Sequence, residues 1–346
     1  MGKVLITGAA GFIGSNLLSN LSEANHEVLG IDNLARPGVA HNLKHLPQKV
    51  IQGDIRDSKL FEELPKDIDI VFHLAASADK PISSIDARQD FEINAAGTLN
   101  VLEFCRKTET KIIYASSSKV YSEYLNQYLC LKRKKDRVHP SNERPLTISP
   151  DLPPDLKSNS PVKSRSPYGC SKFVGEIYCQ EYFATYNVPF VINRLSCIYG
   201  PRQFGNSKQG WLTWLLIAKI LEQRFTIFGD GYQVRDMLYI DDLNELLTRQ
   251  WQKMDSIGGN TYVIGGGLQN SLSVIEAIKL VDQKIPGKNL KVTYKPRRLS
   301  DHQYFIADTN KAGIDLLWKP NTAIQTGLAK TVNWIQKEHQ SLMRLI

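Results

Sequence analysis

The strongest constraint on the fold is a glycine-rich turn that follows a short apolar strand near the start of the chain. Residues 3–7 read KVLIT, and the chain continues Gly8-Ala9-Ala10-Gly11-Phe12-Ile13-Gly14 into a stretch with helical spacing over residues 12–23. Gly8 permits a sharp turn, Gly11 lets backbone N–H groups approach a pyrophosphate, and Gly14 lets the helix pack close to the sheet. The amino terminus of the helix adds partial positive charge that favours phosphate. The segment therefore predicts a strand, a dinucleotide-binding turn and a helix.

Strand and helix patterns continue to alternate through the first 115 residues. Apolar runs rich in branched residues occupy 27–31, 70–74 and 111–115, and helical spacing recurs over 95–106. After a polar stretch, the pattern resumes with a helix from Tyr168 and a strand over 190–194. The chain is therefore expected to be α/β, with a Rossmann-like doubly wound parallel sheet and a smaller α/β C-terminal substrate lobe.

The same patterns suggest where the two parts of the chain divide. The dinucleotide-binding domain is expected to comprise residues 1–195 plus about 237–265, with an insert over about 123–166. The smaller lobe is expected to comprise about 196–236 plus 266–346. The insert is rich in Pro, Ser and basic residues, and we expect it to cross one mouth of the sheet with short helical turns. A disordered linker is the alternative.

Composition bounds the possible partners. The 346 residues include 43 basic and 35 acidic side chains, a formal net charge of +8, and the sharpest basic run is Lys132-Arg133-Lys134-Lys135. No nucleic-acid motif accompanies this run, so a solvated loop is favoured over a nucleic-acid site. No apolar stretch reaches the length of a membrane helix, and the first residues lack the layout of a secretory signal, so a cytoplasmic location is expected. Five irregularly spaced cysteines favour free thiols over disulfides or a metal site.

Side chains at the ends of the expected strands supply further cofactor contacts. Asp32 lies 18 residues after Gly14, where a carboxylate can bind an adenosine ribose and would repel a 2′-phosphate. NAD is therefore favoured over NADP, although Arg36 lies nearby, and a loop cap is the alternative role for Asp32. Asp54 ends the next expected strand and could meet the adenine amino group. The predicted cofactor contacts are Gly8, Gly11, Phe12, Ile13, Gly14, Asp32, Asn33, Arg36, Asp54, Ile55, Leu74, Ala75, Ala76, Ser116, Tyr168 and Lys172.

A tyrosine and a lysine with helical spacing form the candidate reactive pair. In Tyr168-Gly-Cys-Ser-Lys172 the two side chains lie four residues apart, so both can face one cleft. A free tyrosine titrates near ~10, and a neighbouring ammonium together with a nicotinamide charge would lower its pKa enough to make it a base. The serine cluster at residues 116–118 ends an expected strand, and a hydroxyl there can bind the reacting oxygen. Ser117 is the first choice, Ser116 the second.

With these motifs in order, the chain resembles the extended short-chain dehydrogenase/reductase family. The resemblance covers nearly the whole chain and includes TGxxGxxG, Asn94-Ala-Ala-Gly97-Thr98, the serine cluster and YGCSK. It implies a tightly held NAD, a C-terminal lobe for the nucleotide of a nucleotide sugar, a homo-oligomer, and a positioning role for Asn94, which joins the expected cofactor contacts. Sugar-nucleotide dehydratases carry Thr-Asp-Glu where this chain has Ser117, Ser118 and Lys119. Related decarboxylases keep a Glu at the last position. Elimination and decarboxylation are therefore disfavoured, which leaves epimerisation or net dehydrogenation.

Longer segments resemble the CDP-paratose 2-epimerases (CDP-tyvelose epimerases) within that family. These segments are residues 90–94, 166–172, 199–204, 209–211, 225–231, 233–236, 265–266 and 270–273. The resemblance implies a transient keto-sugar, with Tyr168 taking the hydroxyl proton, and inversion at C2 of a CDP-sugar such as CDP-paratose, CDP-tyvelose or a CDP-glucose-like compound. A UDP-sugar 4-epimerase and a non-catalytic NAD sensor are the alternatives.

The same resemblance assigns residues to the substrate. Arg235 and Arg298 would contact the diphosphate, Ile227 and Phe228 would lie against the base, and Arg194 would end a strand near the nicotinamide. A surface ion pair with Asp236 is the alternative for Arg235. The sequence departs from the family at His302 and Gln303, which could remove a cation near the phosphates. The implied substrate contacts are Ser196, Gln209, Gly210, Trp211, Ile227, Phe228, Gln233, Arg235, Arg298 and Asp301.

Overall fold

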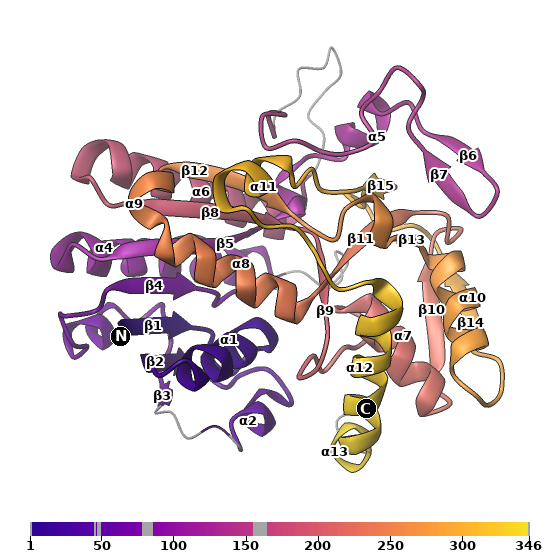
Figure 1. Ribbon diagram of the computed structural model, residues 1–346, viewed down its shortest axis with the longest axis horizontal. Helices are drawn as coiled ribbons and strands as arrows, with labels where there is room; N and C mark the ends of the chain where they lie inside the picture. Colours follow the sequence, from indigo (N-terminus) through magenta and orange to yellow (C-terminus); the bar gives the residue numbers. More distant parts are fainter. Residues whose placement is uncertain (1, 45, 47–49, 78–85, 155–164, 345–346) are drawn as a thin grey trace.

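A seven-stranded parallel sheet forms the centre of the protein in the computed structural model, which describes residues 2–44, 46, 50–77, 86–154 and 165–344 (Figure 1). The strand order is β12-β8-β5-β4-β1-β2-β3, and each neighbouring pair is parallel. This arrangement confirms the predicted doubly wound fold. The strands are β1 (Lys3–Thr7), β2 (Glu27–Asp32), β3 (Val50–Gln52), β4 (Ile70–His73), β5 (Lys111–Ser117), β8 (Phe190–Leu195) and β12 (Asn260–Ile264).

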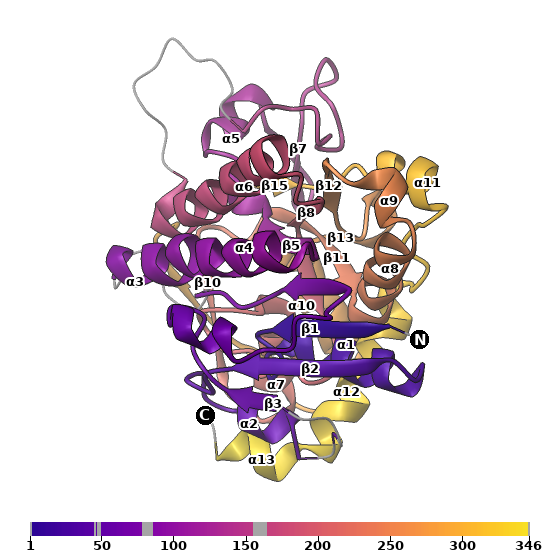
Figure 2. The ribbon, with the colours of Figure 1, turned by 90° about the vertical axis from the view of Figure 1, so that its left-hand side faces the viewer.

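Successive strand residues are buried on opposite faces of this sheet. Val4, Ile6 and Phe72 belong to one apolar cluster, whereas Leu5 and Val71 belong to another. The first face packs on α1 (Phe12–Glu23) and α8 (Ile240–Gln252), the second on α4 (Gly97–Thr108) and α6 (Ser166–Tyr186) (Figure 2). Both faces are therefore covered, which explains why the strands read as continuous apolar runs.

The helices match the sequence prediction unevenly. Helix α1 has the predicted bounds, but the helix expected over 95–106 begins earlier, with α3 (Ala87–Phe91) and the π-helical turn η3 (Glu92–Ala96) before α4. A π-helical turn has no periodic signature in the sequence, because it changes the backbone pairing and not the residue pattern. The remaining helices beside the sheet are α2 (Val39–Asn42), η1 (Ser58–Glu62), η4 (Ser118–Val120) and α9 (Met254–Ile257).

Two smaller sheets lie beside the carboxyl ends of the central strands. In the first, β11 (Val234–Tyr239) pairs with β9 (Cys197–Tyr199), β13 (Ser271–Ser273) and β15 (Tyr304–Phe305). In the second, β10 (Arg224–Phe228) pairs with β14 (Lys291–Lys295). The helices of this region are α7 (Trp211–Ile220), η5 (Leu268–Asn270), α10 (Val274–Lys284), α11 (Asn310–Leu316), α12 (Ile324–Lys337) and α13 (His339–Met343).

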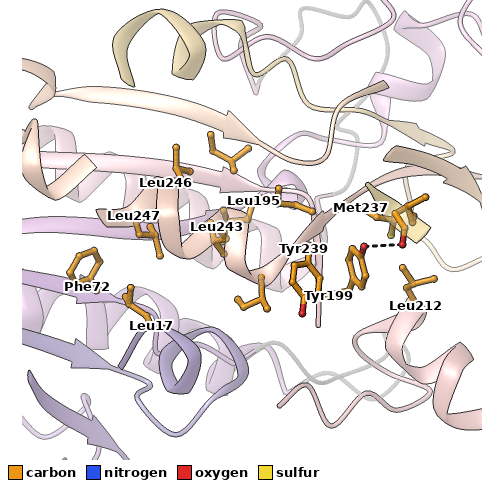
Figure 3. Packing of buried hydrophobic residues seen from close by; sticks show 14 of the residues in the cluster. Leu17, Phe72, Leu195, Tyr199, Leu212, Met237, Tyr239, Leu243, Leu246 and Leu247 are labelled. Atoms are coloured by element: carbon orange, nitrogen blue, oxygen red, sulfur yellow. Dashed lines mark hydrogen bonds between the residues drawn. The ribbon is translucent and has the colours of Figure 1, made fainter. Parts of the chain in front are cut away.

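One apolar cluster continues from the central sheet into the smaller sheets. Figure 3 shows Leu243, Leu246 and Leu247 of α8 in one cluster with Tyr199 and Tyr239, which lie next to each other, and the Tyr199 hydroxyl donates to the carbonyl of Ile324 at 3.4 Å. The two parts of the chain therefore share buried surface, and the domain boundaries given above stay a prediction.

The insert has more structure than the sequence suggested. Within residues 123–154 it contains α5 (Tyr124–Tyr128) and an antiparallel hairpin of β6 (Lys132–Lys134) and β7 (Arg137–His139). The basic run thus lies in a hairpin and not in a loop, although Lys132, Arg133 and Lys134 are exposed as expected. The hairpin lies beside β13 in Figure 1, and Val138 N donates to the carbonyl of Tyr232 at 3.0 Å. The part of the predicted insert over 155–164 lies outside the described residues.

Three further expectations concern the whole chain. No helix among the described residues is both long and apolar enough to cross a membrane. The five cysteines are free, and Cys130 and Cys170 are exposed. Across the described ranges, no group of three or more His, Cys, Asp or Glu side chains is arranged to hold a metal ion.

Candidate active site

A cavity of about 560 Å³ lies at the carboxyl ends of the central strands. Ligands of doubly wound sheets bind at this edge, because the loops that follow parallel strands meet there. Its wall comes from the turns after β1, β2, β4 and β5, from the start of α6, and from residues 209–212 of the second part. The predicted site residues in its wall are Gly8, Gly11, Phe12, Ile13, Gly14, Asp32, Asn33, Arg36, Asp54, Ile55, Leu74, Ala75, Ala76, Ser116, Ser117, Tyr168, Lys172, Ser196, Gln209, Gly210 and Trp211.

The glycine turn leaves room for a phosphate-bearing ligand. Gly8 has a φ of +73°, and a Cβ there would lie 2.7 Å from the Ala75 nitrogen. A Cβ at Gly14 would lie 2.1 Å from the Gly8 carbonyl, so α1 could not sit so near the strand with any larger residue. Gly11 precedes α1, and no side chain caps the first N–H groups of that helix. These uncapped N–H groups border the cavity and fit a pyrophosphate.

Two carboxylates line the cavity, one at the end of β2 and one after β3. Asp32 accepts backbone hydrogen bonds from Ala10 at 3.0 Å and Leu34 at 2.8 Å, so it acts as a loop cap as well as lining the cavity. Each oxygen keeps a second lone pair for a ribose hydroxyl. Asp54 pairs with Arg56 at 2.8 Å, and this guanidinium holds the pKa of the Asp54 carboxyl well below its usual range.

The candidate reactive pair meets the end of β5. Tyr168 and Ser117 line the cavity together, and burial raises the pKa of the Tyr168 phenol although the Ser117 hydroxyl opposes that rise. Lys172 donates from Nζ to the Ala115 carbonyl at 2.8 Å, and burial lowers its pKa to about 7. The predicted lowering of the Tyr168 pKa by Lys172 is thus not found in the protein alone, because the amine is directed at the strand backbone.

Asn94 lies behind the cavity wall and not in it. The buried amide donates to the Ser77 carbonyl at 3.2 Å and to the Ser171 hydroxyl at 3.0 Å, and it accepts from Ser77 N at 2.9 Å. It therefore joins the loop after β4 to α6. This geometry suits the positioning role that the resemblance implied better than direct contact with the cofactor.

Several residues of the cavity wall were not predicted from the sequence. Gln203 lies in a segment quoted for the resemblance, and its amide accepts from Thr213 and donates to the Ile198 carbonyl at 3.1 Å. Most of the others are apolar or small side chains, for which a sequence pattern gives no functional signal. The wall residues without a predicted role include Ile31, Ser77, Gln89, Ile93, Cys197, Gln203, Leu212 and Met237.

Six predicted substrate contacts lie outside the cavity wall, and contacts with other protein groups account for each. Ile227 is fully buried, Gln233 donates to the Phe228 carbonyl at 3.1 Å, and the Arg298 guanidinium lies 3.7 Å from the centre of the Phe228 ring. Arg298 also donates to the Ser207 carbonyl at 2.9 Å. Their roles toward a substrate stay predictions.

Arg235 forms its ion pair with a residue other than Asp236. Arg235 pairs with Asp301 at 3.0 Å, whereas Asp236 accepts hydrogen bonds from Ser196 and from the backbone of Gly267 and Ala307. Asp301 also accepts from Lys119 at 2.8 Å, and these two cations hold its pKa well below the usual range. The alternative of an Arg235–Asp236 pair is therefore wrong.

The end of β5 carries no carboxylate of its own. Ser118 and Lys119 begin the short helix η4, and Lys119 is engaged with Asp301. The carboxylates that elimination chemistry uses at these positions are absent from the described strand end. Tyr168 can move one proton, and the titratable side chain at residues 118 and 119 is the Lys119 amine, which is paired with Asp301.

Comparison with known proteins agrees with this geometry. The NAD dependent epimerase/dehydratase family matches residues 4–265. The CDP-paratose 2-epimerase of Salmonella typhi is 34% identical over 96% of this chain and 98% of its own. A putative UDP-glucose 4-epimerase of Methanocaldococcus jannaschii is 31% identical over 98% of this chain and 100% of its own.

Solved structures give the same result for the fold. The UDP-glucuronic acid 4-epimerase of Bacillus cereus, in complex with UDP-glucuronic acid and NAD, superposes with a TM-score of 0.78 and is 30% identical, covering 97% of this chain and 99% of that one. The UDP-glucose 4-epimerase of Thermotoga maritima with UDP-glucose has a TM-score of 0.77 and 27% identity, covering 97% and 99%. The family is enzymatic and NAD dependent, so the predicted cofactor is confirmed at the level of the family. The chain belongs to the NAD dependent epimerase/dehydratase family.

Proposed function

We propose that the protein is an epimerase of a nucleoside diphosphate sugar, and that its substrate is a CDP-sugar inverted at C2. The observation that carries this proposal is that Tyr168, Ser117 and Lys172 line one cavity, at a strand end that has no carboxylate at residues 118 and 119. One proton acceptor suffices to oxidise a secondary alcohol and to reduce it again. Loss of water needs a further acid and base.

The chain's own groups account for the proton movements. Tyr168 accepts the proton of the sugar hydroxyl, Ser117 binds the same oxygen, and Lys172 lies beneath them where it can also meet the cofactor ribose. NAD, when bound against the glycine turn, supplies a hydride acceptor and later a donor. Tyr168 then returns its proton to the keto-sugar oxygen, so the cycle is redox neutral. The contacts with the nucleotide lie away from the reacting carbon. They keep the keto-sugar bound while the sugar turns over in the cavity.

The nucleotide and the carbon are the finer part of the proposal. The similarity to the Salmonella typhi CDP-paratose 2-epimerase favours CDP and C2, but the UDP-sugar relatives are nearly as similar in sequence and coverage. Gln209 in the cavity wall has a buried Oε1 without a hydrogen-bond partner among the described residues. Such an oxygen can accept a hydrogen bond from the amino group of cytosine, although the imino group of uracil could also donate to it. A UDP-sugar 4-epimerase is therefore the second candidate.

Nuclear magnetic resonance with defined sugars separates the two candidates. Purified protein is incubated in deuterated water with CDP-glucose, CDP-paratose, CDP-tyvelose or UDP-glucose, and each sugar is followed over time. We expect C2 inversion of a CDP-sugar without solvent deuterium at that carbon, because the same hydride returns. C4 inversion of UDP-glucose would instead support the second candidate. Inactivity toward all four sugars with NAD still bound would count against both and favour an untested sugar or a non-catalytic NAD sensor.

A further inference from the structure

A buried ion pair lies directly behind the candidate reactive residues. Glu176 of α6 and Arg194 of β8 have side chains that are 1% and 6% exposed, and Arg194 NH2 lies 2.8 Å from Glu176 Oε2. Arg194 Nε adds contacts of 3.1 Å to both carboxylate oxygens. Glu176 has no role predicted from the sequence, and Arg194 was expected near the nicotinamide. Neither residue lies in the cavity wall.

The same helix face reaches three consecutive residues at the end of β5. Tyr168, Lys172 and Glu176 lie four residues apart, so their side chains project from one face of α6. Lys172 donates to the Ala115 carbonyl at 2.8 Å, Glu176 accepts from the Ser116 hydroxyl, and Tyr168 lines the cavity with Ser117. Two successive turns of α6 thus hold the two strand residues that precede Ser117.

Arg194 fixes Glu176 in turn. In the parallel pairing of β5 and β8, Arg194 is the register partner of Ser116, so the guanidinium and the serine hydroxyl approach Glu176 from adjacent strands. Arg194 NH1 also donates to the Tyr121 hydroxyl at 3.0 Å, and Tyr121 donates to the Ser149 carbonyl at 3.2 Å. A fully hydrogen-bonded buried charge pair holds its members in one arrangement.

We propose that Glu176 is a positioning residue, which holds Ser116 against α6 and thereby keeps the adjacent Ser117 hydroxyl beside Tyr168 in the cavity wall. Arg194 is its buried counter-ion. The inference rests on the roles proposed above for Ser117 and Tyr168, but it concerns contacts that exist without any sugar. It assigns a role to a residue that lies outside the cavity wall.

Removal of the Glu176 carboxylate should shift the pKa of Tyr168 in a predictable direction. Burial raises the pKa of Tyr168, the Ser117 hydroxyl lowers it, and Asp90 raises it, so a displaced Ser117 leaves the raising influences unopposed. Glu176 also raises the pKa of Lys172, as does Cys179. Around Glu176, the other titratable groups are Arg194, Tyr121 and Tyr114. Loss of the carboxylate therefore lowers the pKa of Lys172, and it raises the pKa of Tyr168 through the displaced Ser117 hydroxyl.

The test compares Glu176→Gln with Glu181→Gln in the full-length protein with NAD bound. Glu181 lies on the exposed side of the same helix, so its replacement is the matched control. The titration of Tyr168 is read without sugar, as the phenolate absorbance of each protein minus that of its Tyr168→Phe derivative. We expect the Tyr168 midpoint to move to higher pH in Glu176→Gln and to stay in Glu181→Gln. With a turned-over sugar, we expect kcat to fall on the order of 10²-fold from misplacement, with KM little changed.

A second variant covers the case in which Glu176→Gln does not fold, since it leaves Arg194 buried without its counter-ion. Ser116→Ala keeps the ion pair and removes the hydroxyl that ties the strand to it, so a smaller upward move of the Tyr168 midpoint is expected. An unchanged midpoint in every folded variant, with lower thermal stability as the sole effect, would overturn the inference. If no sugar is turned over by the unaltered protein, the proposed function fails, but the sugar-free titration still decides the role of Glu176.

Discussion

At the scale of single residues, burial sets the protonation of the reactive groups. It raises the pKa of Tyr168 and lowers that of Lys172 to about 7, so both shifts favour the uncharged forms. The Ser117 hydroxyl opposes the effect of burial on the pKa of Tyr168. The positive charge of a nicotinamide ring beside the phenol would act in the same direction. The protein alone therefore holds a proton acceptor that becomes effective when the site is filled.

Replacement of Tyr168 by Phe tests the proton acceptor directly. We expect turnover to fall by a factor of about 10² to 10⁴, because the variant loses the acid–base group and keeps the ring. The NAD content of the purified protein should stay unchanged, measured by absorbance after denaturation. Tyr178→Phe, at an exposed position on the same helix, is the control. A Tyr168→Phe protein that turns over sugar at the normal rate would contradict the role of Tyr168.

At the scale of elements, the sequence predicted what depends on local pattern. The strand β1, the glycine turn and α1 were predicted with their bounds, since the residues that form them are adjacent in the chain. The contact of Glu176 with Ser116 and Arg194 was not, because it depends on how α6 packs on two strands. The contact of Asp301 with Arg235 joins residues 66 positions apart and was missed for the same reason.

The turn between β1 and α1 predicts a sharp response to a single methyl group. In Gly14→Ala the new Cβ would meet the Gly8 carbonyl at 2.1 Å and Ala9 Cα at 2.8 Å, both backbone atoms that cannot rotate away. We expect α1 to shift, NAD to be lost, and the free energy of unfolding to fall by about 1–3 kcal/mol. Urea unfolding measures the change in the free energy of unfolding, and the NAD content of the purified protein measures the loss of NAD.

Gly313→Ala is the matched control for that substitution. Gly313 also lies within a helix, α11, but its Cβ would meet a single heavy atom, the Trp318 oxygen, at an ordinary 3.6 Å. We expect no loss of stability and no loss of NAD. Equal losses in the two variants would mean that the close approach at Gly14 has no special importance.

A buried histidine joins three elements and gives stability a pH dependence. His73 ends β4, its Nδ1 lies 2.7 Å from the Thr7 hydroxyl of β1, and its Nε2 lies 2.9 Å from the Thr98 hydroxyl of α4. Burial lowers the pKa of His73 from 6.5 to about 3. Between these pH values the unfolded chain binds a proton that the folded protein excludes. Stability is therefore full above pH 6.5 and declines as the pH falls toward 3.

His73→Gln isolates that contribution, because an amide does not titrate. We expect the urea midpoint of the unaltered protein to fall more steeply between neutral pH and pH ~4.5 than that of the variant. The corresponding difference in the free energy of unfolding is on the order of a few kcal/mol at most. The variant will also be less stable at neutral pH through imperfect hydrogen bonds. His339→Gln, at an exposed site, is the control. Parallel pH dependences for His73→Gln and the unaltered protein would refute the assignment.

At the scale of the whole molecule, the insert packs on the second part of the chain. Val138 and Ile148 of the insert share an apolar cluster with Tyr304 and Phe305, and Arg137 pairs with Glu276 of α10. Ile148 N donates to the Ile306 carbonyl at 2.7 Å, and the Ile148 carbonyl accepts from Asp308 N at 3.0 Å. The sequence could not predict this, because polar composition describes the exposed side of a segment and not what lies beneath it.

Ile148→Ala tests whether the insert and the second part unfold together. Ile148 is fully buried, so its truncation should cost about 2–5 kcal/mol. If the shared cluster makes them one cooperative unit, the main unfolding transition moves to lower urea with its slope unchanged. Leu146→Ala, two residues away and 51% exposed, should leave the midpoint nearly unchanged. A main transition that stays in place while a small early transition appears would mean that the insert opens independently, and the contacts at Ile306 and Asp308 would then be too weak to couple it to the site.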